Sequence, residues 1–381
     1  MNVIKFARSE VLWTIAAVLL CLSAVGCGVS HQAVEENKQV TGKEEKQLIE
    51  THVAVKDVCA WPNLTLFPDG TIIATIFNQP THGGWEADLD CWASADNGQT
   101  WAFRGRPAPH EPTTNRMNHA VGLARDGSLV VLVTGWSKRN APGLYSSPHD
   151  GQLLPIWVCR SNDGAKTWEH VEGAIQPPGG RPHTMVPFGT IVQNHDGTLG
   201  AAIYGSSDDS KQSEVMFYIS RDDGKTWQMR SVIAQGMNET ALLALPGGRL
   251  LAAARTAGDQ HLELFSSDDV GATWHPGGML SLPKQMPANL LRLADGRIVL
   301  SYGNRCINNF GIDARISRDD GATWSAPIRL ANRTRHDGGY PSSVQLADGR
   351  IVTAFYNQLP DIKYEMCVST WDVNDFDKIK K

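Results

Sequence analysis

Apolar stretches along this chain of 381 residues are interrupted at intervals by pairs of turn-forming residues. The interruptions stand at Asp69-Gly70, Asp126-Gly127, Asp196-Gly197, Gly247-Gly248, Asp295-Gly296 and Asp348-Gly349. After each pair the chain resumes with a small or basic residue and then an apolar one. Asp-Gly between two apolar runs is a strong β-hairpin signal. The pattern therefore predicts six hairpins.

An eight-residue pattern, S-x-D-x-G-x-T-W, recurs between these hairpins. Its copies occupy residues 94–101, 161–168, 220–227, 267–274 and 317–324. Four copies fit at every fixed position, while the second has Gly164 one place early and Ala165 where glycine is expected. Serine and aspartate side chains bond to nearby backbone amides in turns, glycine takes the left-handed conformation, and Thr-Trp returns the chain to an extended course. Each copy predicts a turn between two strands.

The two series together define one repeating unit of strand, hairpin, strand, loop, strand, octapeptide turn and strand. Six such four-stranded units predict an all-β fold, a six-bladed β-propeller over residues 51–381. The sixth unit has its hairpin at residues 348–349 and a third strand near residues 364–371, but no octapeptide. We expect residues 51–58 to supply its missing outer strand.

The octapeptide resembles the Asp box, or BNR repeat, of the sialidase (neuraminidase) superfamily. The copies extend this resemblance from residue 94 to residue 324. It implies a six-bladed propeller of antiparallel blades whose Asp-box turns lie on the rim, away from the active site. The octapeptides therefore indicate the fold, and the catalytic residues must be sought elsewhere.

The first 27 residues are typical of a lipoprotein signal peptide. Lys5 and Arg8 precede an apolar run over residues 11–22, and small residues stand directly before Cys27. The run is too short for a good membrane span. The segment resembles a bacterial lipobox, which implies lipidation of Cys27 and an exported protein at the outer membrane, at the cell surface or in the periplasm. Residues 28–50 are polar and charged and are expected to form a flexible tether.

Charge and cysteine content narrow the expected partners. A net charge of -5 without a basic stripe argues against nucleic acid. The chain contains no CxxC pair and no HExxH motif, so neither a metal nor another cofactor is expected. The odd number of cysteines after the signal cannot all pair, and we expect buried thiols at Cys91, Cys159 and Cys367. The protein is expected to be a monomer that touches the membrane only through its lipid anchor.

In a propeller the innermost strands begin around one central mouth, and two residues there resemble the catalytic pair of sialidases. Tyr340 lies in G-Y-P-S-S, which is similar to the segment of the tyrosine nucleophile. Glu239 follows Asn238 in N-E-T, which resembles the motif of the glutamate that polarises that tyrosine. A phenol is mostly protonated at neutral pH and needs a carboxylate to accept its proton as it attacks. The alternative is structural: Tyr340 caps a strand and Glu239 balances an arginine.

Arginines are expected to hold the carboxylate of an acidic sugar, because a guanidinium donates two parallel hydrogen bonds. Arg255 and Arg305 resemble the sialidase arginines of blades four and five. The first sialidase arginine stands in an F-R-I-P segment, where this chain has C-A-W-P at residues 59–62. Arg116 or Arg181 would have to supply that charge; the alternative for each is a surface or interblade ion pair.

The acid/base residue is the least certain part of the resemblance. Asp88 resembles the sialidase aspartate that begins the third strand of blade one, and we include it among the substrate-binding candidates. The catalytic aspartate that would precede it is absent near residues 82–84. His82 and Glu86 are the nearest proton-transfer candidates, although Glu86 also fits a solvated loop residue. The mouth further carries histidines that common sialidases lack, namely His119, His183 and His336.

These residues indicate an exported, sialidase-like glycoside hydrolase that diverges from typical exo-α-sialidases. It would release a terminal acidic sugar, sialic acid or a related one, from a glycan. Two alternatives stay open: a propeller hydrolase or lyase that acts on uronate- or rhamnose-containing polysaccharide with histidine and tyrosine, and a glycan-binding surface lipoprotein without activity. The pair Tyr340 and Glu239 favours an enzyme, because a binding site has little need of a proton acceptor beside a phenol.

Overall fold

The computed structural model describes residues 48–81, 83–84, 86–137, 152–181, 183–207, 212–258 and 260–379. The predicted signal peptide, Cys27, most of the tether and His82 lie outside these residues. Within the described part of the chain, no helix has the length and hydropathy needed to cross a membrane.

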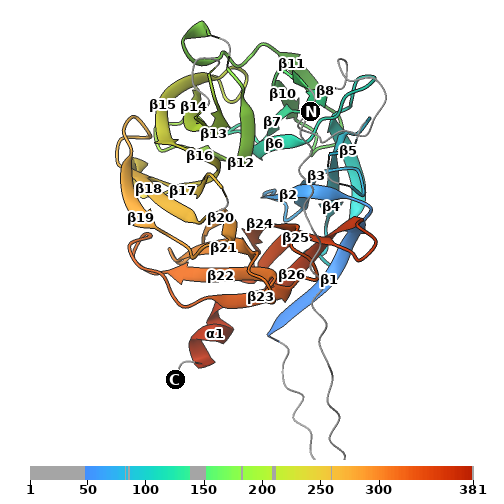
Figure 1. Cartoon of the computed structure of the whole chain (residues 1–381), viewed down its shortest axis with the longest axis vertical. Helices are drawn as coiled ribbons and strands as arrows, with labels where there is room; N and C mark the ends of the chain where they lie inside the picture. Colours follow the sequence, from blue (N-terminus) through green and yellow to red (C-terminus); the bar gives the residue numbers. More distant parts are fainter. Residues whose placement is uncertain are drawn as a thin grey trace, which may run out of the picture. The chain divides into compact units, whose positions relative to one another are not determined.

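Nearly all regular structure consists of antiparallel β-sheet (Figure 1). One four-stranded sheet contains β2 (Cys59–Leu66), β3 (Ile72–Phe77), β4 (Leu89–Ser94) and β5 (Ala102–Ala108). A second contains β16 (Met237–Ala244), β17 (Leu250–Thr256), β18 (Leu262–Ser267) and β19 (His275–Met279). A third contains β20 (Gln285–Arg292), β21 (Ile298–Asn304), β22 (Gly311–Ser317) and β23 (Ile328–Asn332).

An eight-stranded sheet consists of two antiparallel halves. The first half contains β6 (Asn118–Leu123), β7 (Leu129–Thr134), β10 (Trp157–Ser161) and β11 (Glu169–Glu172). The second contains β12 (Val186–Gln193), β13 (Leu199–Gly205), β14 (Glu214–Ser220) and β15 (Gln228–Gln235). A short parallel pairing of β12 with β6 joins them. The short strands β8 (Trp136–Ser137) and β9 (Gln152–Leu153) form a separate pair.

The remaining sheet combines segments from distant parts of the sequence. Its order is β1 (Ile49–Lys56), β26 (Tyr364–Trp371), β25 (Ile351–Gln358) and β24 (Gly338–Gln345), and helix α1 (Val373–Ile379) follows β26. β1 pairs antiparallel with β26, and Thr51 lies opposite Ser369. This pairing confirms the predicted use of an N-terminal segment as the outer strand, although the strand begins and ends two residues earlier than expected.

The strands β2, β6, β12, β16, β20 and β24 lie nearest the common centre of the sheets (Figure 1). Each contacts the next in that order, and β24 contacts β2. The predicted all-β class and the four-stranded antiparallel sheets are confirmed. Among the described residues no sheet closes on itself, and the six-bladed propeller stays a prediction. The arrangement brings the first residues of these six inner strands together.

The hairpins between the first and second strands form where the sequence predicted them. At the first, the Phe67 amide donates to the Thr71 carbonyl, Gly70 adopts a φ of 87°, and Asp69 Oδ1 accepts a hydrogen bond from the Thr71 amide. A positive φ costs glycine little because it has no Cβ. The Gly247-Gly248 site instead forms a short 3-10 turn over Pro246–Gly248.

The five octapeptides fold into turns that share the hydrogen bonds among their Ser, Asp and Thr residues, while the Trp274 indole of the fourth donates to Ser231 Oγ and not within its own turn. In the first, Asp96 accepts from Ser94 Oγ, the Thr100 amide and Thr100 Oγ1, and the Trp101 indole donates to the Gly98 carbonyl. In the irregular copy, Ala165 adopts a φ of 68°, and its amide still bonds to Ser161 Oγ. These turns follow β4, β10, β14, β18 and β22, at the end opposite to the starts of the inner strands.

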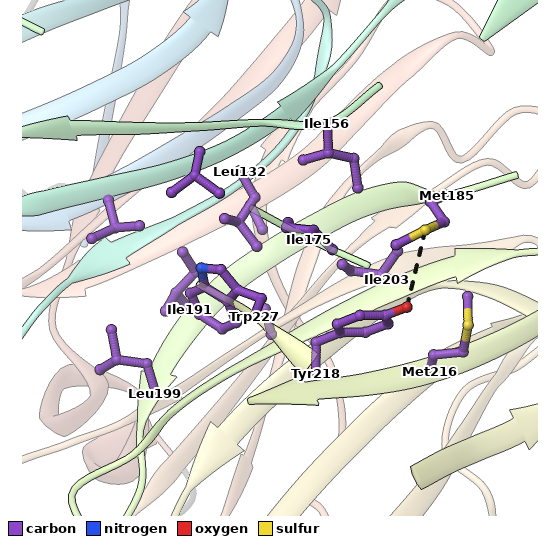
Figure 2. Close-up of a cluster of buried hydrophobic side chains, with 14 of the residues drawn as sticks. Leu132, Ile156, Ile175, Met185, Ile191, Leu199, Ile203, Met216, Tyr218 and Trp227 are labelled. Carbon is purple, nitrogen blue, oxygen red and sulfur yellow. Dashed lines mark hydrogen bonds between the residues drawn. The ribbon is translucent and has the colours of Figure 1, made fainter. Parts of the chain in front are cut away.

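Apolar side chains fill the spaces between neighbouring sheets. In the eight-stranded sheet, Leu132 and Val158 pack against Ile203, Tyr218 and Trp227 of the other half (Figure 2). Complete burial of a leucine or isoleucine side chain is worth about 1.5–3 kcal/mol. The expected thiols Cys91, Cys159 and Cys367 are free and buried, as is Cys59, while Cys306 is partly exposed.

Candidate functional site

The inner strands converge on a small cavity of about 20 Å³ at the centre of the sheets. Residues from all six inner strands line it, including Asn63, His119, Phe188, Ala241, Asn289 and Tyr340. Segments that are far apart in sequence thus meet around one cavity, which Tyr340 also lines. The predicted mouth residues can be placed relative to this point.

Tyr340, Glu239 and Arg255 form one hydrogen-bonded group. The Tyr340 hydroxyl donates to Glu239 Oε1 at 2.8 Å, and Arg255 Nη1 donates to the same hydroxyl at 3.0 Å. Arg255 Nη1 also contacts Glu239 Oε2 as an ion pair. β16, β17 and β24 position the three side chains, so the group depends on packing between two sheets. A phenol held between a carboxylate and a guanidinium has its proton acceptor already in place.

Burial keeps the phenol protonated. Burial first, and then the negative charge of Glu239, raise the pKa of Tyr340 to about 12, while Arg255 and Arg305 oppose both effects. The hydroxyl therefore carries its proton throughout the neutral range. Attack by this oxygen would require transfer of the proton to Glu239 in the same step.

Arg305 supplies a second guanidinium beside Tyr340. Its Cζ lies 5.4 Å from the centroid of the Tyr340 ring, and the residue is 6% exposed. It directly follows β21, and its backbone amide bonds to the Lys284 carbonyl. The structure thus places Arg255 and Arg305 on the same tyrosine.

The backbone that carries Tyr340 is strained. Gly338, Gly339 and Tyr340 have φ values of 123°, 103° and 51° in succession. Tyrosine rarely takes a positive φ, and such strain persists only when the surrounding structure enforces it. A Cβ on Gly338 would lie 2.5 Å from Arg333 Nη1 and 2.8 Å from the Tyr356 carbonyl oxygen. The tight packing explains why glycine precedes the tyrosine.

Asp337 anchors this segment, although it belongs to none of the motifs described above. Its Oδ1 accepts from the Gly338 amide at 2.8 Å and the Tyr356 hydroxyl at 3.2 Å, and its Oδ2 accepts from the Tyr364 hydroxyl. The Tyr356 ring lies 5.6 Å from the Tyr340 ring. Its place before two glycines and a tyrosine was the only signal that could have indicated it.

Arg333 is a second residue that the motifs did not reveal. Its guanidinium donates to the backbone carbonyls of Asn304, Gly311 and Asp337. Burial and the neighbouring Arg305 charge lower its pKa to about 10. Because several of its donors already bind carbonyls, Arg333 supports the loops around Tyr340.

Trp61 lies beside Tyr340, in the segment where the resemblance would place an arginine. Its ring centroid is 5.5 Å from that of Tyr340, and Phe188 approaches the same ring at 6.1 Å. Ala60 and Trp61 adopt φ values of 44° and 97°. An aromatic side chain therefore occupies a position from which sialidases would supply a charge.

Arg116 and Arg181 have other surroundings. Arg116 is 1% exposed, and its Cζ lies 3.6 Å over the Trp157 ring. It donates to the Pro155 carbonyl at 3.1 Å and lies 3.5 Å from Glu111 Oε2. Arg181 is exposed at the end of the 3-10 turn over Pro178–Gly180. The contacts of Arg116 match the structural alternative for that residue.

The candidate histidines and Asn238 occupy separate environments. His119 lines the central cavity, its Nδ1 lies 3.1 Å from the Met117 carbonyl, and burial lowers its pKa to about 4. Asn238 Oδ1 accepts from the Glu239 amide at 2.8 Å and so fixes the backbone of the N-E-T segment. His183 Nε2 lies 3.4 Å from Glu214 Oε1, and the exposed His336 packs edge-on against Phe310.

The proton-transfer candidates lie in the β3–β4 loop, and Asp88 there is fully engaged. Arg106 Nη1 lies 2.8 Å from Asp88 Oδ2, while His110 Nδ1 lies 2.6 Å from Asp88 Oδ1. Asp88 is 4% exposed, which fits a support for the loop better than a group that meets substrate. Glu86 is exposed with a φ of 54°, and its Oε1 accepts from the Thr113 amide at 3.4 Å. Its role as acid/base stays a prediction.

Comparison with known proteins identifies the family of this chain. Residues 105–353 match the family described as "BNR repeat-like domain". The chain belongs to this family. It is a divergent member of the sialidase superfamily.

The similarity to individual relatives is low. A sialidase from Paraclostridium sordellii is 22% identical over 230 residues, which cover 56% of each chain. A structure of unknown function from Dyadobacter fermentans superposes with a TM-score of 0.70 at 24% identity, over 85% of this chain and 98% of the other. A Hadza microbial sialidase superposes with a TM-score of 0.63 at 18% identity, over 84% and 66%. The chain spans about half the length of the curated sialidases that it matches.

Proposed function

We propose that this BNR-family chain is a six-bladed propeller glycosidase that releases a terminal acidic sugar from a glycan, with Tyr340 as nucleophile. The observation that carries the proposal is the 2.8 Å hydrogen bond from the buried Tyr340 hydroxyl to Glu239. Sialidases among the relatives support the reaction class. The closed cycle of contacts among the inner strands supports the propeller architecture.

The first step is attack of Tyr340 Oη on the anomeric carbon. The phenolic proton passes to Glu239 Oε1 as the bond between the sugar and the tyrosine forms. The bond from the anomeric carbon to the aglycone oxygen breaks, and that oxygen takes a proton from a general acid. A neutral phenol suits this step, because an anionic nucleophile would be repelled by the carboxylate of the sugar.

The second step is hydrolysis of the glycosyl-tyrosine. Water attacks the anomeric carbon and loses a proton to the residue that served as acid in the first step. The bond to Tyr340 Oη breaks, and this oxygen recovers its proton from Glu239. Two displacements at one carbon leave the configuration of the product unchanged.

The charge around Tyr340 favours an acidic sugar. Arg255, Arg305 and Arg333 carry three positive charges against the two carboxylates Glu239 and Asp337, which leaves one excess positive charge in a largely buried region. A buried excess charge is costly unless an opposite charge approaches it. Arg255 and Arg305 are the guanidinium groups positioned for the sugar carboxylate, which favours a sialic acid-related or other acidic sugar that needs two such contacts.

The acid/base residue is proposed to come from the β3–β4 loop. Glu86 has the carboxylate and the exposure that proton exchange with a leaving group requires. His82 belongs to the same loop and is the alternative. Separate Glu86→Gln and His82→Gln variants distinguish them, because the true acid matters most for substrates with poor leaving groups.

Hydrolysis of a panel of methylumbelliferyl sugars, with sialic acid and uronic acids included, tests the proposed function. Wild type should turn over at least one acidic sugar, and Tyr340→Phe should reduce kcat by at least a thousandfold. Tyr218→Phe, which removes a phenol hydroxyl from a different cluster, is the matched control. A fluorinated acidic sugar should leave a covalent adduct on the peptide that contains Tyr340.

Three outcomes would contradict the proposal. Turnover that survives Tyr340→Phe contradicts the role of Tyr340 as nucleophile. Glycan binding without turnover, in wild type and in Tyr340→Phe, indicates a binding lipoprotein. A new ultraviolet absorbance from a polyuronate indicates a lyase.

We also propose that the protein is exported and anchored through a lipid on Cys27. The signal-like sequence of residues 1–27 supports this. Mass spectrometry of the mature N-terminus should find a diacylglyceryl-modified cysteine, and Cys27→Ser should release the protein from the membrane fraction.

A further inference from the structure

A cleft of about 630 Å³ lies outside the Tyr340 site, where the two halves of the eight-stranded sheet diverge. Its floor is the accessible end of the buried cluster between those halves, formed by Ile156, Ile175 and Met185. Met185 and Ile156 lie at one end of that cluster and Leu199 at the other (Figure 2). The half-buried Leu153 and Leu154 form a wall. Clefts of this size and composition are typical of small-molecule sites.

The cleft opens on the same side of the sheets as Tyr340. Thr184 and Met185 directly precede β12, and the Phe188 ring of β12 packs 6.1 Å from the Tyr340 ring. An extended strand advances about 3.3 Å per residue, so the path from Met185 along β12 and across to the Tyr340 ring is at most roughly 16 Å long. One glycoconjugate can therefore reach both places.

The charges of the two places differ. Arg255 and Arg305 lie beside Tyr340, whereas the described lining of the cleft contains neither lysine nor arginine and includes Glu172. An acidic sugar is therefore attracted to the arginines and gains nothing in the cleft. The cleft instead suits an uncharged group with apolar surface, because aliphatic side chains form its floor and wall.

Polar groups lie along one edge of the cleft. The His183 side chain is 4% exposed, and its Nε2 forms no hydrogen bond among the described residues while lying 3.4 Å from Glu214 Oε1. Thr184 Oγ1 and Glu172 lie on the same rim. Buried polar atoms without a hydrogen bond are rare and favour a ligand that supplies one.

We propose that this cleft binds the aglycone of the substrate, and that this aglycone is uncharged and aliphatic. The substrate is then an amphipathic glycoconjugate, with an acidic sugar at Tyr340 and an apolar group between the two halves of the eight-stranded sheet. The inference rests on the proposed function for the acidic end. The cleft itself can be tested without catalysis.

Calorimetric titration with octyl β-glucoside below its micelle concentration, compared with methyl β-glucoside, tests the cleft directly. The full chain should bind the octyl compound at least tenfold more tightly than the methyl compound. Leu154→Asp places a charge in the cleft wall and should weaken octyl binding at least tenfold, while Leu282→Asp, at an exposed leucine elsewhere, should not. Leu154→Gln is a milder variant, and a thermal melt of each protein verifies folding.

The outcomes separate the two proposals. The proposed aglycone site is contradicted if both glucosides bind equally or if neither binds. It is also contradicted if octyl binding survives both folded Leu154 variants. Octyl binding without turnover of any acidic sugar contradicts the proposed function, while the cleft remains a binding site for an apolar group. Once an acidic-sugar substrate is found, Leu154→Asp should raise KM at least tenfold for its octyl glycoside and leave its methyl glycoside unchanged. If the KM of Leu154→Asp changes equally for the octyl and the methyl glycoside, only the proposed aglycone site is contradicted.

Discussion

Arg255 Nη1 donates to the Tyr340 hydroxyl at 3.0 Å while it also pairs with Glu239. One guanidinium nitrogen thus contacts both the proposed nucleophile and its proton acceptor. As the phenol proton moves to Glu239, the negative charge moves from the carboxylate to the phenolic oxygen, and Arg255 stays beside it throughout. The arginine therefore stabilises both ends of the proton transfer.

Replacement of Arg255 by lysine should reduce kcat/KM by about a hundredfold, equivalent to about 3 kcal/mol of transition-state stabilisation. Lysine keeps the charge but cannot reproduce the planar donor geometry of a guanidinium. Steady-state kinetics with the best acidic-sugar substrate measures the effect. Arg249→Lys is the control, because Arg249 is a more exposed arginine just before β17. Equal activity of Arg255→Lys and wild type would contradict the assigned role.

Replacement of Asp337 by asparagine should lower kcat about tenfold with little change in KM. The amide removes the charge that accepts hydrogen bonds from Tyr356 and Tyr364, so the Tyr340 backbone loses its anchor without loss of a group that meets substrate. The separation of kcat from KM identifies a positioning role. Asp361→Asn, in the exposed β25–β26 loop, should change neither. A rise in KM alone would indicate instead that Asp337 contacts the sugar.

Replacement of Gly338 by alanine should destabilise the fold by about 3 kcal/mol or more, through backbone strain and overpacking. The new Cβ would lie 2.5 Å from Arg333 Nη1. Gly349→Ala is a matched control, because Gly349 has a φ of 90° and no heavy atom within 4 Å of the built Cβ. Gly349→Ala should lower the free energy of unfolding by about 1–2 kcal/mol, because of its positive φ alone. Urea unfolding measures the stability of both variants. Equal losses of stability would show that the backbone before Tyr340 shifts to accommodate the added Cβ.

The buried His119 should make the fold sensitive to acid. Its pKa falls from 6.5 to about 4 in the folded protein. Between these two pH values the histidine is protonated in the unfolded chain and neutral in the folded chain. Stability from this residue is present above pH 6.5 and is lost as the pH falls toward 4, by roughly 3 kcal/mol in all. His119→Gln should flatten the dependence of the free energy of unfolding on pH in that range. His275→Gln, at an exposed site, should retain it.

Local sequence patterns were sufficient for the strands and turns. Asp69-Gly70 and its counterparts specify hairpins within a few residues, and the bonds among the octapeptide Ser, Asp and Thr residues join atoms at most four residues apart. Ala165 shows that the pattern tolerates a defect, because its positive φ preserves the bond to Ser161. The pairing of β1 with β26 was also predictable, since the sixth unit lacked one strand.

The surroundings of the site residues were less predictable. The sequence motifs pointed to Tyr340, Glu239, Arg255 and Arg305, and the structure brings these four together. It also places Arg116 against Trp157 and surrounds Asp88 with Arg106 and His110. These contacts depend on how loops from different strands cross, which no local pattern records. Asp337 was missed for the same reason, because its partners Tyr356 and Tyr364 lie on later strands.

The sheet that carries Tyr340 also joins both ends of the described chain. Thr51 of β1 and Ser369 of β26 bond through their side-chain oxygens across 318 positions of sequence. Contacts between such distant segments form late in folding, because the entropy of closing the intervening loop must be overcome first. During synthesis β1 leaves the ribosome long before its partner exists. A chain interrupted before β26 would lack Tyr364, whose hydroxyl donates to Asp337, and the backbone that carries the proposed nucleophile would lose one of its anchors.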